Sequence, residues 1–235
     1  MSPTARSERS PRTAGRPRVP LLTIEGIVDA ALAIVTEKGV GALTMAGLAR
    51  SLGVTPAALY NHVASKDEIL LHVQDRLMAA VDTSGFGAEP WPEAIRRWAR
   101  SYRAVMASQP ALVHAIAMMP IRGAELTTRM YEELAAGLAA VGWRRRSIVP
   151  AIVALESFIF GSAYDANAPE TIFDLDSDDE APVFAEANRA HLAERAPGEA
   201  ADVAFEVGLD ALLSSLGEWA GVAWPEGVRR SPRLD

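Results

Sequence analysis

Apolar residues recur every three to four positions through most of this chain, and no segment alternates apolar and polar residues. The first period is that of an amphipathic α-helix, whereas a half-buried β-strand would alternate. Gly and Pro separate the periodic segments, and Ser or Thr precedes several of them as an expected N-cap. The pattern predicts an all-α fold, with helices over about 24–38, 45–52, 56–62, 65–81, 92–108, 111–119, 123–140, 145–164, 182–195 and 199–219.

The composition excludes several classes of site. The 235 residues include no Cys, so disulfides and Cys-ligated metals are absent, and the four His show no metal-ligand spacing. No Gly-rich phosphate loop and no nucleophile motif occurs, and the acidic run 174–180 lacks the spacing of a calcium loop. We therefore expect no enzyme activity, no bound metal and no cofactor.

The most apolar run, Ile148 to Tyr164, contains Pro150 and Glu156 and is shorter than the roughly 20 residues that a membrane span needs. No apolar stretch follows the arginine-rich N-terminus, as it would in a secretory signal. We expect no membrane association and a cytoplasmic location.

Residues 44–63 carry the most specific signal. Two short expected helices meet across Gly53, which can adopt the positive φ of a tight turn, and Ala49 is small enough to let the two helices cross closely. Leu59 lies on the inner face of the second helix. This spacing predicts a helix-turn-helix, whose second helix enters the major groove of DNA.

We expect eight residues of this region to contact DNA. The tyrosine, asparagine and histidine among them can bind phosphates or base edges, the two alanines allow close approach, and the lysine and threonines lie at helix starts. An alternative is a helical hairpin with polar tips and no DNA partner. The eight residues are Thr44, Thr55, Ala57, Ala58, Tyr60, Asn61, His62 and Lys66.

The distribution of charge agrees with a nucleic-acid partner for the N-terminal part alone. Residues 1–66 hold eight Lys/Arg and four Asp/Glu, whereas residues 67–235 hold 15 and 26, within a net charge of −7. A basic segment on an acidic body favours contact of that segment with a polyanion. Residues 1–20, with five arginines, are expected to form a disordered basic arm that either contacts DNA or is a passive tail.

The sequence of residues 43–70 (LTMAGLARSLGVTPAALYNHVASKDEIL) resembles the DNA-binding domain of tetracycline-repressor-type (TetR-type) transcriptional regulators. The clearest part is LYNHV at 59–63, followed by Lys66. The loop ending at Trp91, the segment rich in Arg and Trp after it, and Gly137 to Trp143 are similar to the C-terminal domain of the tetracycline repressor subfamily.

This resemblance implies a homodimer that binds a palindromic operator and is released by a small-molecule effector. It implies a helix-turn-helix domain over 21–66, a ligand-binding and dimerisation domain over 67–224, and a tail over 225–235. The dimer would form through helices at about 145–164 and 199–219, where apolar residues cover a wide arc. A bundle closed within one chain is the alternative.

Aromatic, Met and His residues of the middle helices are candidates for effector binding, although such a stripe is also typical of plain core. Relative to the tetracycline repressor, Trp98 and Tyr102 replace polar drug-binding groups, and His114 lies about two residues out of register with the metal ligand. The resemblance therefore implies a different, more apolar, metal-free effector. A regulator without a small-molecule effector is the alternative function. The candidates are Trp98, Tyr102, Met106, His114, Met118, Met119, Tyr131, Phe158 and Tyr164.

Overall fold

A computed structural model describes residues 22–193 and 199–228, so the basic arm at 1–20 and most of the 225–235 tail lie outside the described residues. The described parts contain ten α-helices, three short 3₁₀ helices and no strand, which confirms the all-α prediction. The N-terminal helices are α1 (Ile24–Lys38), η1 (Val40–Ala42), α2 (Met45–Ser51), α3 (Pro56–Tyr60) and α4 (Lys66–Met78). The remaining helices are α5 (Trp91–Ala107), α6 (Pro110–Ala117), α7 (Glu125–Ala140), α8 (Arg145–Asp165), η2 (Glu170–Phe173), η3 (Asp178–Glu180), α9 (Pro182–Ala193) and α10 (Ala200–Ala220).

The first four α-helices begin at the residues that the sequence predicts. At each start a Ser or Thr hydroxyl accepts a hydrogen bond from the backbone N–H three residues later, and these four caps are Thr23, Thr44, Thr55 and Ser65. Such caps satisfy backbone donors that the helix itself leaves unpaired. Gly53, in the turn between α2 and α3, has φ of +66°, a conformation that other residues rarely adopt.

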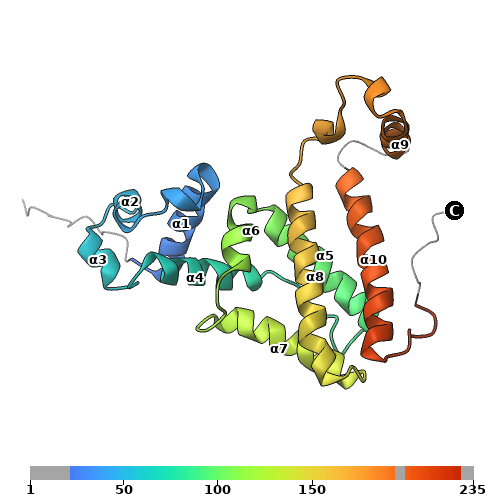
Figure 1. Ribbon diagram of the computed structural model, residues 1–235. Helices are drawn as coiled ribbons and strands as arrows, with labels where there is room; N and C mark the ends of the chain where they lie inside the picture. Colours follow the sequence, from blue (N-terminus) through green and yellow to red (C-terminus); the bar gives the residue numbers. More distant parts are fainter. Residues whose placement is uncertain (1–21, 194–198, 229–235) are drawn as a thin grey trace, which may run out of the picture.

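The N-terminal helices share one small core. Leu48 on α2 and Leu59 on α3 are fully buried, as is Ile27 on α1, and Ala49 lies where α2 meets α3. Burial of one face of α3 leaves its opposite face outside the protein. In Figure 1 these helices form a separate lobe, and α4 leads from that lobe to the remaining helices.

Helix α5 lies at the centre of the C-terminal part. Its residues Ile95, Trp98, Tyr102 and Met106 are almost completely buried, and α5 packs against α4, α6 and α8. Helices α8 and α10 lie side by side (Figure 1), and the ring of Phe158 on α8 occupies the space above Gly208 on α10. A Cβ added at Gly208 would come within 2.6 Å of that ring, so only glycine allows this approach.

Helix α8 is the one described helix that is long and apolar enough, by length and composition alone, to cross a membrane. The expectation that every apolar run is too short is therefore wrong for α8, because the helix extends from Arg145 to Asp165. The helix packs against α5, α6, α7 and α10, and 44% of its most apolar window is buried. A core helix of a globular domain accounts for its apolar composition.

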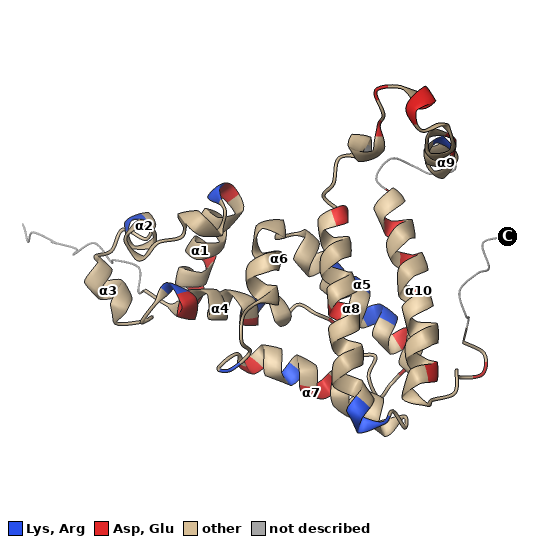
Figure 2. Cartoon of the chain, in the orientation of Figure 1, with Lys and Arg blue, Asp and Glu red and all other residues tan. Residues whose placement is uncertain are grey.

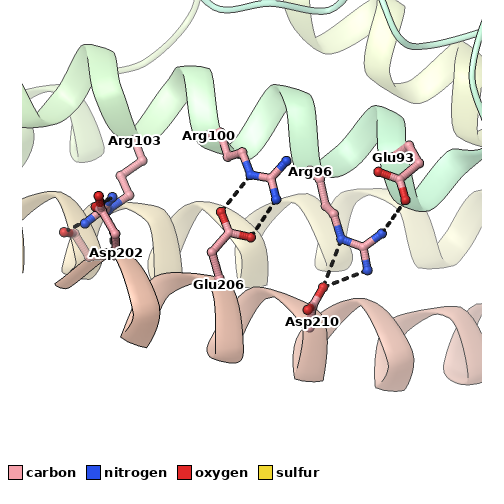
Figure 3. Close-up of polar contacts among 8 residues, drawn as sticks. Glu93, Arg96, Arg100, Arg103, Asp202, Glu206 and Asp210 are labelled. Atoms are coloured by element: carbon pink, nitrogen blue, oxygen red, sulfur yellow. Dashed lines mark hydrogen bonds and ion pairs between the residues drawn. The ribbon is translucent and has the colours of Figure 1, made fainter. Parts of the chain in front are cut away.

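Three arginines of α5 form ion pairs with three acids of α10, as Figure 3 shows. The guanidinium of Arg96 donates to Asp210 at 2.7 and 2.9 Å, that of Arg100 donates to Glu206 at 2.6 and 2.7 Å, and that of Arg103 donates to Asp202 at 2.5 Å. The order of the pairs requires that the two helices run antiparallel. Only the Arg96–Asp210 pair is deeply buried, with exposed side-chain fractions of 7% and 11%.

Substitution of these arginines should therefore have unequal effects on stability. Arg96→Met leaves the Asp210 carboxylate without its principal counter-charge in the interior, and we expect a loss of about 3–5 kcal/mol in the free energy of unfolding. Arg100→Met, at a pair exposed to water, should cost less than about 1 kcal/mol. Urea denaturation followed by circular dichroism measures both values, and equal losses would contradict this account of the α5–α10 contact.

Candidate nucleic-acid interface and effector site

Helix α3, its two caps and the turn after it present most of the predicted DNA-binding residues to solvent. Tyr60 is 53% exposed, Ala57, Asn61 and His62 are exposed, and Ala58 is half-buried. On the opposite side, Leu59 is fully buried and holds the helix on its core. The helix-turn-helix spacing in the sequence thus corresponds to a short helix whose outer face is free to enter a groove.

Helices α2 and α3 themselves carry no negatively charged side chain. Helices α2 and α3 contain Arg50 and no Asp or Glu, whereas acidic residues are frequent on η3 and on α10 (Figure 2). Repulsion of a phosphate backbone from this face of the N-terminal lobe is therefore small.

The residues at the helix starts have contacts of their own. The hydroxyls of Thr44 and Thr55 accept the capping hydrogen bonds and keep their own proton for a further acceptor such as a phosphate. The ammonium group of Lys66 donates to the carbonyl of Val40 at 2.8 Å, so one of its three N–H groups is used within the protein. Asp67 and Glu68 follow in the same turn of α4, which makes this helix start less favourable for a phosphate than the lysine alone indicates.

The structure brings four of the effector candidates together and separates the others. On α5, Trp98 and Tyr102 form an edge-to-face pair with ring centroids 5.5 Å apart, and Met106 is buried one turn further on. Tyr131 on α7 joins them through Glu156, described below. The other candidates lie elsewhere: His114, Met118 and Tyr164 are exposed, Met119 is half-buried, and Phe158 stacks on Phe205 of α10.

Glu156 on α8 is a member of this cluster that the sequence analysis did not assign to it. The hydroxyls of Tyr102 and Tyr131 both donate to Oε1 of Glu156, at 3.3 and 2.5 Å. Burial raises the pKa of Glu156 despite these two hydrogen bonds, and burial beside the carboxylate raises the pKa of both tyrosines. The sequence contained one signal that could have assigned Glu156 to the cluster: it is an acidic residue in the middle of the most apolar run of the chain.

Two polar atoms near the centre of the domain are also buried without a partner. Nε1 of Trp98 and Oε1 of Gln74, on α4, have no hydrogen bond within the described residues. Buried polar groups are nearly always paired in native proteins. An unpaired donor next to Tyr102 and an unpaired acceptor on the neighbouring helix α4 are therefore candidates for contact with a bound ligand.

Helix α4 is attached to both parts of the molecule. Towards the C-terminal part, Asp75 accepts hydrogen bonds from the backbone N–H of Thr127 at 2.7 Å and from its hydroxyl at 3.1 Å, in the first turn of α7. Towards the N-terminal lobe, Arg76 pairs with Asp29 of α1. Tyr131 lies one turn after Thr127 on α7. A short chain of contacts therefore links Glu156 to the helices that carry α3.

The buried carboxylate predicts a specific dependence of stability on pH. A raised pKa means that the folded protein binds a proton more tightly than the unfolded chain does, so Glu156 stabilises the fold least when pH exceeds its raised pKa. We expect Glu156→Gln, which still accepts from both tyrosines, to increase Tm by a few degrees at neutral pH. The increase should shrink as pH falls towards 4.5, the ordinary pKa of a glutamate, as measured by differential scanning calorimetry. A gain that does not change with pH would contradict the assignment.

Comparison with known proteins agrees with both halves of this description. A family model described as bacterial regulatory proteins of the tetR family matches residues 27–73, and a model of the tetracyclin repressor-like C-terminal domain matches residues 83–218. An HTH-type transcriptional regulator of Saccharopolyspora erythraea is 30% identical over 67% of this chain and 64% of its own length. The transcriptional repressor DrrR1 of Streptomyces coeruleorubidus is 28% identical over 65% of this chain and 56% of its own length.

Solved structures show the same fold. ActR of Streptomyces coelicolor, in complex with actinorhodin, matches with a TM-score of 0.68 and 23% identity over 86% of this chain and 98% of that chain. TetR of Acinetobacter baumannii AYE matches with a TM-score of 0.63 and 23% identity over 85% and 98%. The alignments with the two curated relatives span less than two thirds of their lengths. The C-terminal family match alone covers more than half of the chain, and the chain therefore belongs to the tetracycline repressor family of bacterial regulatory proteins.

Proposed function

We propose that this protein is a DNA-binding transcriptional regulator that acts as a repressor and is released from a palindromic operator by a small, largely apolar effector without a metal ion. The observation that carries the proposal is the outer face of α3 and the turn after it, where Tyr60, Asn61 and His62 are exposed while Leu59 anchors the helix. A protein that binds an operator acts in the cytoplasm, where we place it.

The relatives support two elements of this proposal, repression and the binding of a small molecule. One is named a transcriptional repressor, and the solved structures include ActR bound to actinorhodin and a variant of the A. baumannii TetR bound to minocycline. For this chain, the buried aromatic cluster on α5 and α7 is the corresponding candidate for the effector site. Its members have large apolar surfaces, and they carry the polar atoms that a ligand would contact.

In the proposed mechanism, α4 transmits the response. Two copies of α3 bind successive major grooves, about 34–36 Å apart. An effector that prefers a different position of α7 and α8 shifts the equilibrium by its difference in affinity for the two conformations. The Asp75–Thr127 contact moves α4 with α7, and the Arg76–Asp29 pair moves α1 with α4, so the spacing between the two copies of α3 changes.

The proposed dimer interface consists of the exposed faces of α8 and α10. Val149 and Val153 on α8 are 66% and 54% exposed, and Val207 and Trp219 on α10 are also exposed. Large apolar side chains left exposed on two adjacent helices are typical of a surface covered by a second copy. A symmetric pairing of these two helices from each copy gives a four-helix bundle.

The proposed recognition helix makes a direct prediction for DNA binding. Tyr60→Ala removes a side chain that reaches a phosphate or base edge, and we expect about a tenfold or greater loss of affinity. Fluorescence anisotropy, with a duplex selected by the wild-type protein from a random library, measures the change. Met118→Ala, which alters a similarly exposed side chain outside the N-terminal lobe, is the control and should leave affinity unchanged. Unchanged affinity in Tyr60→Ala would mean that α3 is not the recognition helix.

The proposed interface makes a second prediction. Val153→Asp places a charge without a partner between two copies, and we expect the dissociation constant of the dimer to increase by about two orders of magnitude. Val141→Asp, at an exposed valine after α7, is the matched control and should remain dimeric. Analytical ultracentrifugation distinguishes the two results. A dimer that tolerates Val153→Asp would place the interface elsewhere.

A further inference from the structure

We propose that Glu156 selects the effector by charge, and that the effector of this protein carries a protonated basic nitrogen that pairs with the Glu156 carboxylate. This inference rests on the proposed function, because it concerns the same effector site. It goes beyond that proposal by naming the chemical class of the ligand, an alkylamine attached to an apolar aromatic ring system.

The first argument is the absence of a counter-charge. Within residues 22–193 and 199–228, the hydrogen bonds to Glu156 come from Tyr102 and Tyr131, and no Lys, Arg or His forms an ion pair with it. The deeply buried Arg96, by contrast, is paired with Asp210. A carboxylate in an apolar interior is costly unless a cation accompanies it. Glu156 therefore leaves a place for a positive charge that the protein itself does not fill.

The second argument is the direction of the existing hydrogen bonds. Both tyrosines donate to the same oxygen, Oε1, and the described residues place no donor on Oε2. Glu156 is partly exposed rather than fully buried, so Oε2 is not sealed inside the core. An ammonium group is a donor that fits this position. Both tyrosines donate to Oε1, so the lone pairs of Oε2 are available to accept from the ammonium group.

The third argument is the aromatic environment. Tyr102 lies between Trp98 and Phe160, with ring centroids 5.5 and 5.6 Å from each, in edge-to-face arrangements. Aromatic faces attract cations and provide apolar contact for a flat ligand. Nε1 of Trp98, which lacks a partner, offers a donor to a carbonyl or hydroxyl oxygen of the same molecule.

Recognition at Glu156 is also connected to the proposed response. Tyr131 binds Glu156 and lies one turn from Thr127, which holds Asp75 of α4. A cation that pairs with the Glu156 carboxylate changes the hydrogen bond that this carboxylate accepts from Tyr131. The charge-selecting group is therefore in direct contact with the helix that moves α4.

A set of three probes with one scaffold tests the inference. Dansylcadaverine carries a primary alkylamine on an aromatic dansyl group, its N-acetyl derivative is neutral, and its N-succinyl derivative is anionic. We expect the wild-type protein to bind the amine about tenfold or more tightly than the acetyl derivative, because a charge-assisted hydrogen bond is lost on acetylation. The succinyl derivative should bind more weakly still. Titrations followed by dansyl fluorescence give the three dissociation constants.

Two variants locate the preference for the amine. Glu156→Gln should reduce the ratio of the two dissociation constants to about one, whereas Glu132→Gln, at an exposed glutamate of α7 beside Tyr131, should keep the wild-type ratio. Circular dichroism checks the folding of both. The order of affinities for the amine, the acetyl derivative and the succinyl derivative is measured on the wild-type protein. The inference can therefore be tested even if a variant does not fold.

Equal affinities for the three probes, no saturable binding of the amine, or a preference that persists in Glu156→Gln would each overturn the inference. DNA binding by the same wild-type preparation separates this result from the proposed function. A protein that binds a selected duplex and shows no preference for the amine remains a regulator with a different effector. A protein that binds no duplex at low salt contradicts the proposed function itself.

Discussion

The contact between α5 and α10 determines much of the C-terminal part of this molecule. Three arginines spaced about one turn apart on α5 meet three acids with matching spacing on α10, so one antiparallel register pairs all of them. A shift of α10 by one turn would keep only two of the three arginines opposite an acid. The pairs thus specify the alignment of α10, and with it the face that α8 and α10 present together.

The starts of the first four α-helices could be predicted from the sequence because their determinants are local, whereas α3 and α4 end at Tyr60 and Met78, before the predicted 62 and 81. Thr23, Thr44, Thr55 and Ser65 cap their own helices, and Gly53 provides the positive φ of its own turn. Information of this kind is contained in a few consecutive residues. The exposed face of α3 follows from it, since burial of Leu59 determines which side chains point outwards.

The effector site could be predicted only in part, since it depends on contacts between distant segments. Periodicity placed Trp98, Tyr102 and Met106 on the buried face of one helix, but it also included Phe158, which packs on α10. His114 and Met118 belong to a short helix whose orientation the sequence does not determine, and both are exposed. In the sequence, Glu156 only interrupts an apolar run, because its two tyrosine partners are 25 and 54 residues away and the fold alone brings them together.

The close approach of the Phe158 ring to Gly208 limits how α8 and α10 can move relative to one another. Since the ring of Phe158 fills the space above Gly208 and stacks on Phe205, α8 and α10 interlock and cannot slide past one another without expelling that ring. This interdigitation favours movement of α8 and α10 as one unit. In the proposed mechanism, a displacement of α7 relative to this pair of helices is transmitted along α4 to the N-terminal lobe.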